Sequence, residues 1–408
     1  MTLAIRVLIG LLAGFLLGLT LTGNSSPFAT MTIGILTPVG AIFVNLIRMT
    51  VIPLLVSMVV ANVGAMTASR GLTRIGVRAV LISVGLLTTA AIGSLLIARP
   101  ILARIPIDSA AALALRASTT PVVPVATSAG PTLATWFMDL VPQNVVKAAA
   151  DGAMLPLIFF AVIFGLALTR VSDARRDAVL RVIEGIAEAM QRLVIWILGL
   201  APIGVFALAV PLASRLGLSA AGAVIAYVVL VVALTVAAVG LLLYPLGVLA
   251  GPMSAAAFVS YCAPSQAIAF ASRSSLAALP AMVDSAERAG LPPGSSRVVL
   301  PLSMAVFHFG AAVAQTVGVV FLARLFDVTL TPSQLASVVV AVVVASFAVP
   351  GIPGGSIIAM VPVLAVANLP LDGVGILLAV DTIPDMFRTT ANLTGAMTLT
   401  AVLPAPQD

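Results

Sequence analysis

Long apolar runs dominate the first 250 residues, and short polar segments separate them. A membrane-spanning helix needs about 20 consecutive apolar residues. Several of the runs exceed that length, which predicts tilted or broken helices. The pattern predicts six spans, near residues 4–22, 31–66, 77–98, 131–169, 183–212 and 218–250.

The pattern changes after residue 250, where Ser, Gly and Pro clusters interrupt shorter apolar arms. The interruptions are Ala269–Pro280 (AFASRSSLAALP) and Val349–Ser356 (VPGIPGGS). Irregular backbone at membrane depth is tolerated only where it lines a cavity or is buried in protein. Two such segments in corresponding positions indicate the binding site of a transporter. We therefore predict re-entrant hairpins near 254–289 and 332–369, with a full span after each, near 296–326 and 372–403. The predicted fold is an all-α membrane protein with eight transmembrane helices and two re-entrant helical hairpins.

A polar stripe crosses the last predicted span. Asp381, Asp385, Arg388 and Asn392 follow one another at spacings of four, three and four residues, so one helix face would carry all four. A charged residue at membrane depth costs about 2.5–3.5 kcal/mol on insertion scales and survives where it faces a cavity, a partner or a substrate. This stripe is the first candidate for a functional site.

Composition places the chain among polytopic membrane proteins. It is 61% hydrophobic and 8% charged, with a mean hydropathy of +1.22, whereas soluble domains carry about 25% charged residues. The net charge of +6 does not indicate nucleic acid, because Lys147 is the only lysine and most arginines lie in short loops. The apolar run from Ala4 to Leu21 lacks a convincing cleavage site, so we interpret it as a first span and not as a signal peptide.

Enzyme chemistry has little support in the sequence. One cysteine, Cys262, excludes an internal disulfide and disfavours a Cys-based metal site. There is no Gly-rich phosphate loop. We expect no enzyme activity and no cofactor.

Charged loops predict the orientation in the membrane. Arginines cluster at Arg70, Arg74 and Arg78, and again between Arg170 and Arg181. Both loops would be cytoplasmic if the N-terminus is inside, by the positive-inside rule. The stretch Ile101–Pro131, rich in Ala, Thr, Ser and Pro, is predicted to be a loose external loop.

Three motifs in the C-terminal half resemble those of the dicarboxylate/amino acid:cation symporters, the glutamate transporter family. They are Ser272–Pro280 (SRSSLAALP), Pro350–Gly355 (PGIPGG) and Asp385–Gly395 (DMFRTTANLTG), with support from Arg48–Leu54 (RMTVIPL) and Ala201–Ala207 (APIGVFA). The resemblance covers nearly the whole chain, and the motifs stand in the family's order.

The resemblance implies a homotrimer in a bacterial or archaeal cytoplasmic membrane, with cytoplasmic N- and C-termini and an elevator mechanism. It implies a scaffold from residues 1–76 and 131–215, and a transport domain from 77–100 and 216–408, with 101–130 as an external loop. The transport domain would slide through the membrane, with the second hairpin as the extracellular gate.

The resemblance also implies roles for the polar stripe. Asp385 would bind the substrate ammonium, Arg388 its side-chain carboxylate and Asn392 its α-carboxylate. The chemistry agrees, because a guanidinium fork matches a carboxylate. The alternative is that Asp385 and Arg388 merely neutralise each other. A dicarboxylate has no ammonium, so Asp385 favours an acidic amino acid, aspartate or glutamate.

The hairpin tips complete the expected site. Ser274 and Ser275 are expected to contact the substrate carboxylate, or else to act only as helix caps. Arg273 would shape the site electrostatically through Asp385 or Asp381. The expected substrate-binding residues are Arg273, Ser274, Ser275, Gly351, Ile352, Pro353, Gly354, Asp385, Arg388, Thr389 and Asn392. Simple turn geometry is the alternative for the glycines.

This chain departs from sodium-coupled members of the family, which carry Asn-Met-Asp-Gly-Thr in the seventh span. Aligned on Pro301–Leu302 and Gln315, this chain has Phe307-His308-Phe309-Gly310-Ala311, and the family's aspartate after Gly395 is Ala396. Sodium prefers oxygen ligands, and the side chains of Phe307, Phe309, Ala311 and Ala396 supply none. We therefore predict no metal ligands at these positions and reduced or absent sodium coupling, unless backbone carbonyls build the sites.

A co-transported proton is the predicted replacement, and transport without any coupled ion is the alternative. His308 is the only histidine, and histidine exchanges protons near neutral pH. His308 and Asp381 are the candidate carriers. The alternatives are that His308 is buried and hydrogen-bonded with only a packing role, and that Asp381 lies behind the binding residues or pairs with Arg273.

Other functions are alternatives to the transport of acidic amino acids. A C4-dicarboxylate carrier of the same fold is the nearest alternative. An intramembrane aspartyl protease needs two aspartates on facing helices, whereas Asp381 and Asp385 are predicted on one helix. A non-transporting sensor or a channel is a further alternative, and ligand binding without any uptake would support the sensor.

Overall fold

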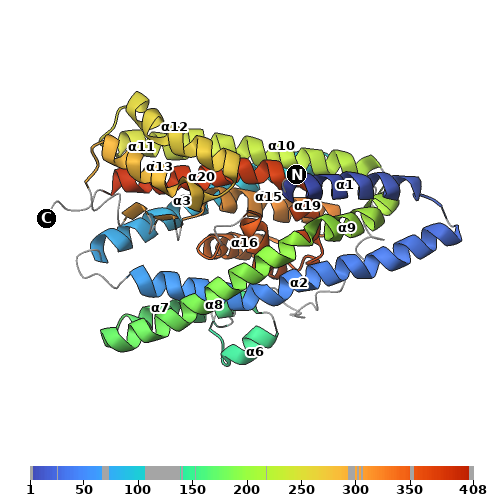
Figure 1. The fold of residues 1–408 in the computed structure, drawn as a ribbon, viewed down its shortest axis with the longest axis horizontal. Helices are drawn as coiled ribbons and strands as arrows, with labels where there is room; N and C mark the ends of the chain where they lie inside the picture. The colour runs from blue at the N-terminus through green and yellow to red at the C-terminus, as the bar shows by residue number, and fades with distance from the viewer. Residues whose placement is uncertain are drawn as a thin grey trace.

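The computed structural model describes residues 3–24, 26–66, 73–105, 138, 141–151, 153–216, 218–292, 299–300, 303–304, 307–349 and 353–403, and every regular element in them is a helix (Figure 1). The first half contributes α1 (Leu3–Thr20), α2 (Pro27–Met66), α3 (Thr73–Ala103), α6 (Val145–Ala150), α7 (Met154–Leu168), α8 (Asp173–Gly199) and α9 (Ala201–Leu216). The second half contributes α10 (Leu218–Ala238), η1 (Val239–Leu243), α11 (Tyr244–Leu249), α12 (Ala255–Ser272), α13 (Ser275–Arg288), α15 (Phe309–Leu325), α16 (Pro332–Ala345), α17 (Gly355–Ile358), α18 (Val361–Val366), α19 (Gly373–Val380) and α20 (Thr382–Val402).

The helices pack in two groups along the long axis of the molecule. In the first helix group, α1 packs on α9, and α2 packs on α7, α8 and α9. In the second helix group, α15 packs on α3, α10 and α20, and α20 packs on α10 and α12. In Figure 1, α2, α7 and α8 lie along one side, and α10 to α13 with α20 lie along the opposite side. The two groups meet where α19 packs against α1 and α9.

Three described helices, 27–64, 78–103 and 222–249, are each long and apolar enough to cross a membrane, and the bent pair α8–α9 is a fourth candidate. Shorter apolar helices include those at 5–20, 156–168 and 309–325. The predictions of helix near 4–22, 31–66, 77–98 and 218–250 are confirmed. The count of eight spans stays a prediction.

Two of the longer predicted spans are broken, as their lengths predicted. The described part of the span at 131–169 consists of two helices, α6 and α7, because the Ala153 N–H donates to the Ala148 carbonyl and closes the end of α6. The span at 183–212 starts earlier, at Asp173, and bends by 58° between α8 and α9. Pro202 causes this break, because its ring disfavours helical backbone just before it and it has no N–H to donate.

The two regions predicted as hairpins contain paired helices with irregular tips. In the first, α12 and α13 pack on each other around Arg273 and Ser274. In the second, α16 packs on α18, and the short α17 follows Gly354, whose φ of +75° suits a glycine. A capping box of Thr331 and Gln334 starts α16. Gly351 and Ile352, and most of the predicted external loop 101–130, lie outside the described residues; α3 extends into that loop as far as Ala103.

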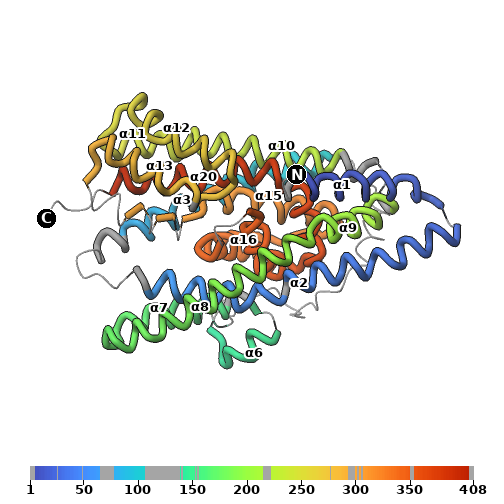
Figure 2. Tube along the Cα trace, in the orientation of Figure 1, coloured from blue at the N-terminus to red at the C-terminus, as the bar shows by residue number. Residues whose placement is uncertain are grey.

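The last two predicted spans are both interrupted. The predicted span at 372–403 is wrong as a continuous helix, because it breaks at Asp381 into α19 and α20. Pro384 explains the break, since it cannot donate the bond that a continuous helix would send to the Val380 carbonyl. In the predicted span at 296–326, the described residues 299, 300, 303 and 304 are helical, Phe307 and His308 are not, and α15 begins at Phe309. In Figure 2 the red C-terminal trace runs through the bundle beside the yellow and orange hairpin helices.

Candidate functional site

A buried arginine organises the site. The Arg388 side chain, on the second turn of α20, is 1% exposed. Its Nη1 and Nη2 donate to the two carboxylate oxygens of Asp381 at 2.8 and 2.7 Å, and Nη2 also donates to Asp385 Oδ1 at 2.6 Å. Its Nε has no hydrogen-bond partner among the described residues. Two carboxylates therefore share one guanidinium at the helix break.

Both hairpin tips approach the second oxygen of Asp385. The Gly354 N–H, from the tip of the second hairpin, donates to Asp385 Oδ2 at 3.3 Å. Arg273 Nη1, from the tip of the first hairpin, lies 3.9 Å from the same oxygen. The structure thus brings both tips to one carboxylate of α20, and it pairs Asp381 with Arg388 instead of Arg273.

The first hairpin tip is shaped by its backbone. Arg273 ends α12 in a left-handed conformation, with φ +54°, and its N–H donates to the Ala269 carbonyl at 2.8 Å. The Ser274 hydroxyl accepts from the Ala277 N–H at 3.3 Å and so caps α13, with Ser275 as the first residue of that helix. This contact supports the alternative that Ser274 acts as a helix cap.

Asn392 is held by backbone amides of α15. Its Oδ1 accepts from the N–H groups of Gly310 at 2.8 Å and Ala311 at 3.3 Å. Because the oxygen is occupied, the Asn392 side-chain NH₂ is the part left to donate to a ligand. Thr389 is also buried on α20. The sequence pattern did not reveal these amides as partners, since backbone groups carry no residue signature.

His308 joins the break before α15 to the second hairpin. Its Nδ1 lies 2.9 Å from the carbonyl oxygen of Ser346, at the end of α16, and the side chain is buried. A carbonyl only accepts, so Nδ1 carries the hydrogen and Nε2 is the nitrogen open to a second proton. Gln315, farther along α15, donates to the Ser356 carbonyl at 2.9 Å.

The positions that depart from the family motif are apolar in three dimensions as well. Phe307 and Phe309 are buried, with ring centroids 6.0 Å apart. The Phe307 ring packs on Gly395 so closely that a side chain there would meet it. Ala311 and Ala396 are also buried. Among the described residues, no group of three His, Cys, Asp or Glu could hold a metal ion.

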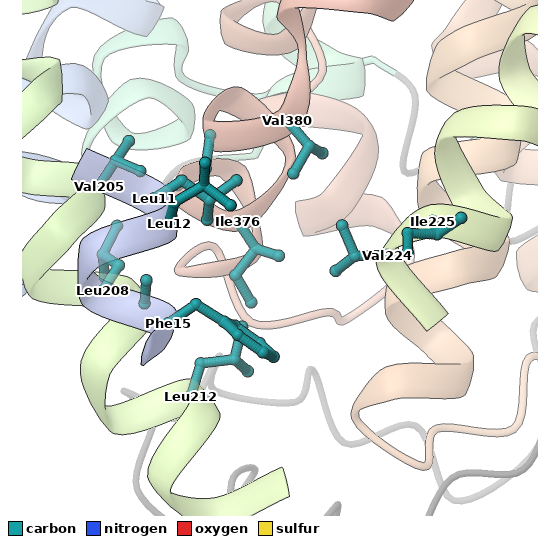
Figure 3. Close-up of a pocket in the computed structure, with 13 residues that line it drawn as sticks. Leu11, Leu12, Phe15, Val205, Leu208, Leu212, Val224, Ile225, Ile376 and Val380 are labelled. Carbon is teal, nitrogen blue, oxygen red and sulfur yellow. The ribbon is translucent and has the colours of Figure 1, made fainter. Parts of the chain in front are cut away.

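Two cavities lie at the boundary between the helix groups. The smaller, of about 50 Å³, is lined by Arg273, Pro353, Gly354, Asp381 and Thr382, with Val7, Leu198, Ala201 and Leu378. The larger, of about 190 Å³, lies between α1 and α9 on one side and α10 and α19 on the other (Figure 3). Its lining is wholly apolar, so it offers nothing to an amino acid's charged groups.

Sequence comparison agrees with the motifs at this site. The model of the sodium:dicarboxylate symporter family matches residues 3–405. The chain belongs to this family. Its symporter relatives include the proton/glutamate-aspartate symporter of Escherichia coli (strain K12), 28% identical over 400 residues that cover 97% of this chain and 90% of the relative.

Two further relatives differ in the ions and substrates that they are named for. The proton/sodium-glutamate symport protein of Bacillus subtilis (strain 168) is 29% identical over 395 residues, 96% of this chain and 90% of the relative. The C4-dicarboxylate transport protein of Yersinia enterocolitica is 26% identical over 378 residues, 90% of this chain and 84% of the relative. These symporters are transport proteins by name, not enzymes.

Proposed function

We propose that this protein is a secondary active transporter of acidic amino acids, aspartate or glutamate, that works by proton symport and needs no sodium. The observation that carries the proposal is the buried cluster of Arg388, Asp381 and Asp385, which two hairpin tips approach. A packing role alone is a poor explanation for three ionisable groups inside a membrane protein. Relatives named as glutamate and aspartate symporters support the substrate class.

Each substrate group has a chemically matched partner in the proposed site. Arg388 binds the side-chain carboxylate, Asp385 the ammonium, and the Asn392 NH₂ donates to the α-carboxylate. Ser274, Ser275 and Thr389 supply hydroxyls and N–H groups beside them. Pro353 and Gly354 belong to the tip of the proposed gate, and Gly351 and Ile352 remain expected substrate-binding residues. No cofactor takes part.

The ion preference follows from what replaces the sodium ligands. Buried Phe307, Phe309, Ala311 and Ala396 bring no side-chain oxygen to a cation. A proton needs only one acid or base, and both His308 and Asp381 are buried near the site. Sodium sites made of backbone carbonyls are the alternative. The name of one relative, the proton/sodium-glutamate symport protein, includes both the proton and sodium.

The proposed architecture follows the two helix groups. The first group, α1, α2 and α7 to α9, is the scaffold, and the second group, with α3, is the transport domain that moves as an elevator. We propose a homotrimer in a bacterial or archaeal cytoplasmic membrane, with both termini in the cytoplasm.

Uptake of radiolabelled L-aspartate into proteoliposomes tests the substrate class. Saturable uptake, blocked by unlabelled L-glutamate and weakly by succinate, is the expected result. The second candidate is a C4-dicarboxylate carrier, favoured by the similarity to a relative of that name. Stronger inhibition by succinate than by glutamate would establish that candidate instead. Binding without uptake would indicate a sensor.

Changing Asp385 to asparagine should separate the two substrate classes. The variant loses the charge that faces the ammonium, and losing one partner of a buried charge pair costs about 3 kcal/mol, or about 100-fold in affinity. Calorimetry should therefore show aspartate binding weakened about 100-fold, and any succinate binding weakened far less. Asp284→Asn, at an exposed position of α13, is the matched control and should bind aspartate like the wild type. Equal losses for both ligands would contradict the assignment of Asp385 to the ammonium.

A further inference from the structure

Asp381 occupies the two terminal nitrogens of Arg388, Nη1 and Nη2, that a substrate carboxylate would bind. Its two oxygens accept from Nη1 and Nη2 at 2.8 and 2.7 Å, which fills the end-on fork of the guanidinium. Bidentate contact of this kind is the strongest that arginine makes with a carboxylate. A ligand carboxylate that binds Arg388 therefore competes with Asp381 for the same charge.

The remaining partners of Asp385 and Asp381 differ. Asp385 also accepts from the Gly354 N–H and lies 3.9 Å from Arg273. It therefore keeps these two contacts if Arg388 binds a ligand instead. Both hydrogen bonds of the Asp381 carboxylate come from Arg388. From α10, Tyr227 interacts electrostatically with Asp381 and Arg388, and its buried hydroxyl has no hydrogen-bond partner among the described residues. Asp381 is thus the acid that loses its hydrogen bonds when a ligand carboxylate binds Arg388.

Charge counting shows what the loaded site requires. The charged side chains that face one another are Asp381, Asp385, Arg273 and Arg388, two of each sign, and they sum to zero. An acidic amino acid adds one net negative charge. A buried carboxylate without a cationic partner is far more stable in its neutral form. One proton on Asp381 would return the loaded site to zero.

Asp381 also has room for water beside it. It lines the cavity of about 50 Å³ at the boundary between the helix groups, with Arg273 and Gly354 on its own side and Val7, Leu198 and Ala201 opposite. A cavity needs a volume of roughly 10–15 Å³ to hold one water molecule. Neither Arg388 nor Asp385 lines this cavity. Water in this cavity can therefore exchange a proton with Asp381.

We propose that Asp381 is the proton-binding group of this transporter and that competition for Arg388 couples the proton to the substrate. The inference rests on the proposed transport of acidic amino acids. When the substrate carboxylate pairs with Arg388, the Arg388–Asp381 pair breaks, and a proton from cavity water adds to an Asp381 oxygen. Release of the substrate reverses each change, and Asp381 gives its proton back to water.

This exchange makes the coupling obligatory. The empty site with ionised Asp381 is neutral, and so is the site that holds both substrate and proton. Substrate alone leaves one negative charge, and a proton alone leaves one positive charge. A net charge in the membrane interior is costly, so the two neutral forms cross and the two charged forms do not. A C4-dicarboxylate would require two protons by the same count.

Proton counting during ligand binding tests the proposal. Titration calorimetry of L-aspartate in two buffers with different ionisation enthalpies measures the protons taken up per ligand. The wild type should take up about one proton, and its affinity should fall by up to about tenfold per pH unit as the pH rises. Asp381→Asn should bind aspartate with no proton uptake and with an affinity independent of pH. Asp284→Asn and His308→Gln should keep the wild-type proton count.

The outcomes separate this inference from the proposed function. Aspartate binding with no proton uptake by the wild type, or with unchanged uptake by Asp381→Asn, overturns the role of Asp381 and leaves the transport proposal standing. Loss of uptake in His308→Gln alone assigns the proton to His308. No binding of any acidic amino acid by the wild type overturns both proposals.

Infrared difference spectroscopy covers the case in which Asp381→Asn does not fold. Adding aspartate to the wild type should produce the band of a protonated carboxyl group, and Asp381→Glu should shift its frequency. An absent band, or one that Asp381→Glu does not shift, overturns the proposal.

Discussion

Arg388→Gln should lose aspartate binding and also unfold at a lower temperature than the wild type. The guanidinium carries hydrogen bonds to two buried carboxylates. Removing one partner of a buried ionic cluster costs about 3–5 kcal/mol, because the remaining charges lose their compensation. We expect a clear drop in Tm of the purified protein and at least about a 100-fold loss in affinity, measured by calorimetry.

A double variant separates the two losses. Arg388→Gln with Asp381→Asn restores charge balance, so it should recover much of the stability while still failing to bind aspartate. Arg192→Gln is the control, because the Arg192–Glu188 pair on α8 spans 3.8 Å with both side chains about 70% exposed, and such pairs contribute little. Normal binding by Arg388→Gln would contradict the assigned role of the arginine.

Gly310→Ala should disrupt the site from the opposite helix. A Cβ at Gly310 would lie 2.5 Å from the Arg388 carbonyl oxygen and 2.9 Å from the Arg388 Cα. Backbone atoms cannot rotate away, so α15 and α20 must separate, and overpacking of this kind costs about 1–3 kcal/mol. The separation would also stretch the bonds from Gly310 and Ala311 to Asn392. We expect a lower Tm together with at least about a tenfold loss in aspartate affinity, or about 1.4 kcal/mol.

Gly318→Ala on the same helix is the matched control. Its Cβ would meet Met360 Cε at 3.0 Å and Leu377 Cδ1 at 3.1 Å, the ends of flexible side chains that can move. It should keep both its Tm and its affinity close to wild type. If Gly310→Ala behaves like Gly318→Ala, the close contact of α15 and α20 does not position Asn392.

The sequence indicated where the helical hairpins turn better than it indicated the paths of the long helices. Ser, Gly and Pro clusters marked both hairpin tips, and the costly charges of Asp385 and Arg388 marked the stripe. The predicted helix is interrupted where α19 ends at Val380, but Asp381 still caps α20, and its carbonyl accepts from the Asp385 N–H at 2.7 Å. Pro384 was the visible signal for that break, as Pro202 was for the bend between α8 and α9.

Other features had no signal in the sequence. The amides of Gly310 and Ala311 that hold Asn392, and the Ser346 carbonyl that accepts from His308, are backbone groups. Any residue type supplies them, so only the fold identifies which ones face the site. The pairing of Arg388 with Asp381 joins residues seven positions apart across the helix break, and it depends on a side-chain conformation that spacing alone does not fix.

The most direct test of the central claim is accumulation of radiolabelled L-aspartate in proteoliposomes with pH and sodium gradients imposed separately. An inward proton gradient without sodium should drive accumulation above the external concentration, and a sodium gradient at equal pH should drive none. Accumulation that requires sodium would contradict the account, because the cation would then be held by carbonyl oxygens near Phe309 and Ala396 despite the missing side-chain ligands.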